Sequence, residues 1–361
     1  MMNTIPVGVL YSSQSQYRKV SYQTLIGTQF GIAQVNANPH FDFKLGAVHK
    51  DPFGQKNTYI NHARQLQKQG IEHLFGTTTI DSRLRVLESM EGDSALLWSS
   101  ALSGKQQHFD SLVEFGASPD SYLLPLLEYA FQEEGTKCAI VSPNDQLGWE
   151  LSEMTTSYVK TGGGTLTFDN YYREGCRTFH YTIRSLLTHR PDFVVNHLMG
   201  EASYAFLTEL NRDWDGHPLT VLCSHMSRSE SVALGKLDKI RILNASCFFE
   251  PVNPLFTQRV YRDLSKVYVS GGFVSAYLSV LAFGYAVNLA KSTEPGAVRR
   301  ALGDVHLPTP FGDSVSVSEQ RIELPTYLAE LSGDNVTLIQ ASSDISMRPA
   351  YTAKSNRLVL E

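Results

Sequence analysis

Short apolar segments alternate with amphipathic segments along most of this sequence, and the apolar segments end in loops rich in Ser, Thr or Gln. Residues 5–11, 43–48, 71–75 and 94–98 are such apolar segments. Strands that are apolar on both faces and alternate with helices form parallel sheets with helices on both sides. The sequence therefore predicts an α/β fold built from doubly wound, Rossmann-like sheets.

The alternation runs twice along the 361 residues, which are too many for one hydrophobic core. Two late strands, at 327–331 and 336–341, follow both runs, so we expect the chain to cross more than once between two lobes. The expected crossings of this three-crossing hinge are residues 119–122, 250–253 and 322–327. The expected lobes are residues 1–121 with 252–324, and residues 122–251 with 325–361.

Residues 71–82 contain a short buried strand, a turn at Gly76 and a hydroxyl-rich loop before a helix expected over 82–91. Asp81 or Ser82 is the expected N-cap. Open α/β sheets hold ligands at the carboxyl ends of their strands, where free N–H groups of the next helix face the crevice. The loop lacks the glycine and lysine pattern of a phosphate cradle. Its hydroxyls suit a small neutral polar ligand or a carboxylate, or else they only turn the chain.

Charge, cysteine content and the start of the chain narrow the function further. The formal net charge of −5 and the absence of a basic run argue against direct nucleic-acid binding. The four cysteines are far apart, which favours free thiols in a reducing compartment over disulfides or zinc. The first strand begins at Ile5 with no signal-peptide pattern before it, so a cytoplasmic location is expected.

Residues 273–290 carry no charge and imitate a membrane span. Ser275, Ser279 and Asn288 interrupt the apolar run, and a buried helix between two layers explains it better. We therefore expect no membrane insertion.

No catalytic constellation is visible in the sequence. The eleven histidines are scattered, and His225, at a strand end, is the best of the weak catalytic candidates. Asp145 and Glu201 are either a carboxylate pair at a ligand or solvated and helix-capping groups. Trp149 either stacks on a ligand or packs in the core. We expect no enzyme activity, no metal and no cofactor.

Several short motifs occur in a shared order along nearly the whole chain. They are residues 5–12, Asp51-Pro52-Phe53-Gly54, residues 70–76, residues 310–317, and the tail 327–351 with Arg348-Pro349. Together they resemble the type I periplasmic-binding-protein fold. The order is most similar to the cytosolic amide-binding sensors of amidase operons (the AmiC type) and to urea and short-chain amide binders.

The resemblance implies a ligand cleft between the lobes, lined by strand-end loops. It implies ligand contacts at Ser12, Thr78, Thr79, Ile80, Ser99, Ser100, Ala101, Asp145, Leu147, Met199, Gly200, Ser224 and His225. Trp149 and Glu201 are further candidates beside these loops.

This sequence departs from the amide sensors at the expected pocket. Thr77 to Ile80 replace a Cys-Tyr-Met-Ser segment, Ser99-Ser100-Ala101 replace Tyr-Pro-Thr, and Asp145 stands at an aromatic position. We therefore expect a polar ligand other than acetamide. Amino-acid binders of the wider family carry an acidic residue near Met226, which is absent here unless Asp145 or Glu201 takes its role.

Two functions follow from the resemblance. The first is a cytosolic sensor of an amide-like, urea-like or related polar ligand that regulates a partner, by resemblance an RNA-binding transcription antiterminator. The alternative is the substrate-binding protein of an ABC transporter for branched-chain amino acids, urea or short-chain amides. The sequence leaves a homodimer open as the assembly.

Overall fold

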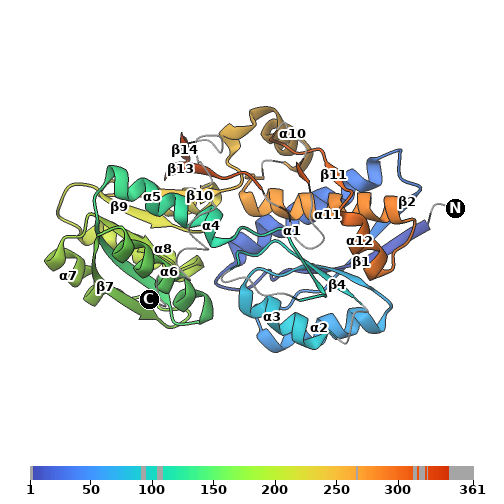
Figure 1. Ribbon diagram of the computed structural model, residues 1–361, viewed down its shortest axis with the longest axis horizontal. Helices are drawn as coiled ribbons and strands as arrows, with labels where there is room; N and C mark the ends of the chain where they lie inside the picture. The colour runs from blue at the N-terminus through green and yellow to red at the C-terminus, as the bar shows by residue number, and fades with distance from the viewer. Residues whose placement is uncertain are drawn as a thin grey trace.

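The first lobe contains a five-stranded parallel sheet in the order β2-β1-β3-β4-β5. The computed structural model describes residues 3–90, 95–103, 109–265, 267–311, 315–316, 322 and 324–340. The strands are β1 (Asn3–Leu10), β2 (Phe43–His49), β3 (His73–Gly76), β4 (Leu96–Ser99) and β5 (Leu112–Glu114). Figure 1 shows this lobe beside a second one, with blue and orange helices packed together over the sheet.

Helices from two distant parts of the sequence cover this sheet. They are α1 (Arg18–Ala37), α2 (Lys56–Lys68), α3 (Ile80–Ser89), α10 (Pro254–Leu264), α11 (Gly271–Ala290) and α12 (Pro295–Leu302). A two-stranded ribbon, β11 (His306–Leu307) with β12 (Val315–Ser316), belongs to the same later segment. Helices α1 and α11 pack closely, because a Cβ added at Gly27 would lie 2.3 Å from the Phe273 carbonyl oxygen.

The uncharged run of the sequence is this buried helix α11. It is long and apolar enough to cross a membrane, but 78% of its apolar window is buried inside the protein. A helix that is apolar all round is typical of a core between two layers. The expectation of a buried helix is confirmed by this packing.

The second lobe contains a seven-stranded sheet in the order β14-β13-β10-β9-β8-β6-β7. Its strands are β6 (Lys137–Pro143), β7 (Thr165–Tyr172), β8 (Phe193–Asn196), β9 (Leu219–Cys223), β10 (Ile240–Ser246), β13 (Tyr327–Ser332) and β14 (Asn335–Gln340). Strands β6 to β10 are parallel, and the hairpin of β13 and β14 joins antiparallel to β10. Its helices are α4 (Pro119–Tyr122), α5 (Leu124–Glu133), α6 (Gln146–Thr161), α7 (His180–His189), α8 (Gly200–Asp213) and α9 (Arg228–Leu234), and η1 (Glu250–Val252) follows β10.

The predicted α/β architecture of two lobes with parallel-rich sheets is confirmed. One hydrophobic cluster joins residues 5–115 to residues 247–322, and other clusters belong to the second lobe. We keep 121, 251 and 324 as the proposed lobe boundaries. The four cysteines are free.

Several local predictions need correction. Helix α3 begins at Ile80, earlier than expected, because Thr79 and Ser82 form a capping box. Strand β5 and helix α9 were not expected. Residue 94, residues 312–314 and 317 of the motif at 310–317, and the tail 341–361 lie outside the described residues.

Candidate functional site

A cleft between the lobes contains two neighbouring chambers. A deep chamber of about 90 Å³ lies against the hinge. An outer chamber of about 560 Å³ lies towards solvent. Thr78 and Leu102 of the first lobe and Met199 of the second line both chambers, so these three residues form the junction.

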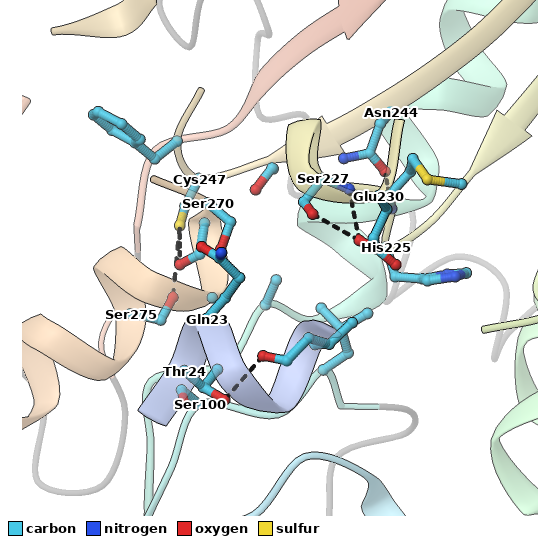
Figure 2. Close-up of a pocket in the computed structure, with 18 of the residues that line it drawn as sticks. Gln23, Thr24, Ser100, His225, Ser227, Glu230, Asn244, Cys247, Ser270 and Ser275 are labelled. Atoms are coloured by element: carbon cyan, nitrogen blue, oxygen red, sulfur yellow. Dashed lines mark hydrogen bonds between the residues drawn. The ribbon is translucent and has the colours of Figure 1, made fainter. Parts of the chain in front are cut away.

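Strand ends and two helices bring polar side chains to the deep chamber. Gln23 and Thr24 come from α1, and Ser100 follows β4. His225 follows β9 on the opposite wall. Figure 2 shows Gln23 pointing into the space between the start of α11, at Ser270, and the His225 loop.

Some polar atoms of this chamber have no hydrogen-bond partner within the described part of the chain. They are the Gln23 Oε1 atom, the Thr78 Oγ1 atom and both ring nitrogens of His225. Gln23 is only 4% exposed and Thr78 only 6% exposed. A buried polar group without a partner costs about 1–3 kcal/mol, so these atoms are suited to meet a polar ligand.

The charged groups of the deep chamber already have hydrogen-bond or ion-pair partners. The Glu230 carboxylate accepts hydrogen bonds from Ser227 N–H at 2.8 Å and from the Tyr204 hydroxyl at 2.7 Å. Burial raises the pKa of Glu230. The Glu250 carboxylate pairs with Arg228 and accepts a 2.9 Å bond from Val269 N–H. The chamber therefore offers a ligand mainly neutral donors and acceptors.

Two histidines behind and beside this chamber are held neutral. Burial lowers the pKa of both His197 and His225 to about 3. His197 Nε2 lies 3.0 Å from Thr155 Oγ1, and its Nδ1 lies 3.4 Å from Ser224 Oγ. A neutral imidazole has one donor and one acceptor nitrogen, so His225 can give both kinds of bond to a ligand.

The free energy of unfolding is expected to fall as the pH is lowered from 6.5 towards 4. His197 takes up its proton near pH 6.5 when unfolded but only near pH 3 when folded. The unfolded state then binds more protons, which costs about 1.4 kcal/mol of stability per pH unit for this side chain. Urea denaturation across this range measures how steeply the free energy of unfolding changes with pH. The slope should be smaller for His197→Asn than for wild type by the equivalent of one bound proton. Equal slopes for the two proteins would contradict the lowered pKa of His197 in the folded state.

The outer chamber is lined by loops of both lobes. Asp145 lies in the loop between β6 and α6. Its carboxylate caps α6 by accepting a 2.8 Å hydrogen bond from Gly148 N–H. Its pKa is raised, first by burial and then by Glu174 and Asp81. Lys56 Nζ lies 3.3 Å from Asp81 Oδ2 and 3.7 Å from Glu174 Oε2.

Ten of the fifteen predicted ligand-binding residues line a chamber. Those of the deep chamber are Thr78, Ser100, Ala101, Met199, Ser224 and His225. Those of the outer chamber are Thr78, Thr79, Ile80, Asp145, Leu147 and Met199. The structure brings these residues together from loops that are far apart in the sequence.

The structure places the other five outside both chambers. Ser12 and Ser99 are buried behind their loops, where Ser12 Oγ donates to the Gln14 carbonyl and Ser99 Oγ accepts from Ala101 N–H. Trp149 is 54% exposed, and its indole N–H donates to Asn144. It is therefore neither core nor chamber wall. Gly200 and Glu201 contact the opposite lobe instead.

Direct contacts join the lobes across the cleft. The Glu201 N–H donates to the Gln16 carbonyl oxygen at 3.2 Å, and the Glu201 carboxylate lies 3.6 Å from Arg18. The Gln16 side-chain amide donates to Glu174 at 2.6 Å. The lobes thus touch through residues that flank the outer chamber.

Sequence reasoning missed Gln23 and Glu230 as chamber residues. Ser227 and Glu230 have the spacing of a capping box, which could have located α9 and its carboxylate beside the strand end. Gln23 lies within a helix, and no local pattern marks it. Among the described residues, no cluster of three or more His, Cys, Asp or Glu could hold a metal ion.

Two α/β lobes with a ligand cleft at their strand ends define the type I periplasmic-binding-protein fold. Residues 5–356 match the model of the periplasmic binding protein domain, so the chain belongs to this family. Members of the family bind ligands. The match does not distinguish the amidase-operon sensors from other members of the family, so that resemblance stays a prediction.

Solved structures of similar fold share little sequence with this chain. An ABC-transporter solute-binding protein from Rhodopseudomonas palustris, in complex with benzoate, is 12% identical with a TM-score of 0.82, covering 94% of this chain and 96% of that chain. The branched-chain amino acid transporter substrate-binding protein LivJ from Streptococcus pneumoniae, in complex with isoleucine, is 13% identical with a TM-score of 0.79, covering 93% and 99%. No curated protein matches the chain in sequence.

Proposed function

We propose that this protein is the solute-binding component of an ABC transporter and captures a small polar solute in the deep chamber without chemical turnover. The observation that supports this most directly is the set of unpaired polar atoms on both walls, Gln23 and Thr78 from one lobe and His225 from the other. A solute that bonds to both walls favours the arrangement in which the lobes touch.

The chamber limits the size and chemistry of that solute. At about 10–15 Å³ for each water-sized group, a volume of about 90 Å³ holds roughly six to nine non-hydrogen atoms. Gln23 Oε1 requires a donor, and neutral His225 requires one donor and one acceptor. Amino acids and short amides meet these requirements, and the benzoate and isoleucine bound to two structural neighbours are of this size.

A thermal-shift screen of amino acids, amides, ureas and aromatic acids tests the proposal. A Gln23→Leu variant is expected to bind the identified solute about tenfold more weakly, since one hydrogen bond is worth about 1.4 kcal/mol. Gln65→Leu changes an exposed glutamine on α2 in the same way and should leave affinity unchanged. Equal affinities of the two variants, or no binding of any solute, would refute this proposal.

The sensor function and its antiterminator partner stay predictions from resemblance. The structural neighbours support transport better, because their described roles are in ABC transporters. The predicted cytoplasmic location also stays a prediction, and cell fractionation distinguishes it from the envelope location that transport requires.

A further inference from the structure

The deep chamber lies next to a much larger one. Thr78, Leu102 and Met199 line both spaces, about 90 Å³ and about 560 Å³ in volume. A solute longer than the deep chamber would reach past these three shared wall residues towards the outer chamber. The lining of the outer chamber then decides what the far end of the solute can be.

That lining carries excess negative charge. Asp81, Asp145 and Glu174 contribute three carboxylates, and Lys56 contributes one ammonium group. Lys56 already forms ion pairs with Asp81 and Glu174. Asp145 forms no ion pair within the described ranges of the chain, and its hydrogen bond comes from a backbone N–H. A cation entering this space would be attracted, and most strongly beside Asp145.

Aromatic rings line the same space. Tyr17, Tyr59 and Phe53 are all part of its wall, and the Phe53 ring is more than half exposed. Aromatic faces attract organic cations through the ring quadrupole, by about 0.5–1 kcal/mol at exposed sites. Rings together with carboxylates are the surroundings that an ammonium or guanidinium group prefers.

An independent feature at the junction also indicates a ligand. Thr78 is only 6% exposed and lines the outer chamber, and its Oγ1 atom has no hydrogen bond of good geometry in the part of the chain described, with only a weaker contact to the Tyr59 hydroxyl of the same wall. A solute that passes from one chamber to the other runs directly beside this hydroxyl. This oxygen is thus placed to accept or donate a bond along the path.

We propose that the natural solute is elongated, with a neutral or zwitterionic polar head in the deep chamber and an organic cation, ammonium or guanidinium, in the outer chamber. This inference rests on the proposed solute-binding function. It assigns the outer chamber as the part of the cleft that selects among solutes with similar heads.

Calorimetry with two matched pairs of probes tests the inference. L-Arginine and L-citrulline have nearly the same shape, but only arginine carries a side-chain charge. 6-Aminohexanamide and hexanamide offer the same comparison with an amide head. At low ionic strength the cationic member of at least one pair is expected to bind more than tenfold tighter.

The Asp145→Asn/Glu174→Gln double variant should abolish this preference, measured as the ratio of the two affinities within a pair, because a change in the contacts between the lobes affects the cationic and the neutral member alike. Asparagine keeps the helix cap, so the fold is retained. Asp238→Asn, an exposed acidic residue paired with Lys236, is the matched control and should keep the preference.

Equal binding within both pairs, a preference that survives in the double variant, or binding of other solutes but none of these four probes would overturn the inference and leave the proposed function standing. Failure of every solute in the thermal-shift screen would instead overturn the proposed function.

Discussion

A Gly200→Ala variant is expected to bind its solute about a hundredfold more weakly than wild type, whereas Gly163→Ala should bind with unchanged affinity. A Cβ at Gly200 would lie 2.2 Å from the Gln16 carbonyl oxygen of the opposite lobe. The same oxygen accepts the Glu201 N–H bond that joins the lobes. The added methyl group therefore pushes the lobes apart where they must meet around a solute.

Gly163 provides a matched control for backbone strain. Both glycines have positive φ, +59° at Gly200 and +75° at Gly163, but a Cβ at Gly163 meets nothing within 4 Å. Each alanine is expected to cost about 1–2 kcal/mol of stability through its left-handed conformation. Only Gly200→Ala also hinders closure of the lobes around the solute. The expected hundredfold loss of affinity corresponds to about 2.7 kcal/mol of binding free energy.

Calorimetry on the identified solute and solution scattering with and without it measure the two effects. Scattering of Gly200→Ala should stay that of the open form at solute concentrations that close wild type and Gly163→Ala. If both variants bind alike, the Gly200 contact has no part in closure.

An Arg83→Met variant is expected to lower the free energy of unfolding by about 3–5 kcal/mol. Arg83 of α3 pairs with Glu114 of β5 at 2.6 Å, and the two side chains are only 4% and 14% exposed. Methionine fills a similar volume, but it leaves the Glu114 carboxylate buried without its partner. The loss is large because removing one member of a buried pair leaves a charge that has already been desolvated.

Two further variants separate charge from packing. Arg83→Met/Glu114→Leu replaces the whole pair with apolar groups and should recover most of the loss. Arg262→Met removes a 76% exposed arginine that pairs with Asp263 at 3.1 Å, and should cost about 0–1 kcal/mol. Urea denaturation measures all four proteins. A cost for Arg83→Met no larger than that for Arg262→Met would show that the pair is not effectively buried.

Local sequence determined the elements whose signals are contained within a few residues. Pro295 and Gly303 bracket α12, and the turn after Ser332 separates the two strands of the hairpin. The uncharged run became α11. Apolar strand periodicity and strand-end hydroxyls were sufficient to predict two lobes and polar loops at the sheet edge, because parallel strands place all their carboxyl ends at one sheet edge.

Tertiary structure alone decided the contents of the cleft. Gln23 and His225 are 202 positions apart in the sequence and meet across one chamber only because two lobes face each other. The short strand β5 exists through its pairing with β4, since three residues carry too little local pattern to mark a strand. Whether Ser12 or Thr78 faces the ligand depends on where each hydroxyl points after its loop is packed. Such orientations are set by contacts between distant segments, and the local sequence pattern carries no information about them.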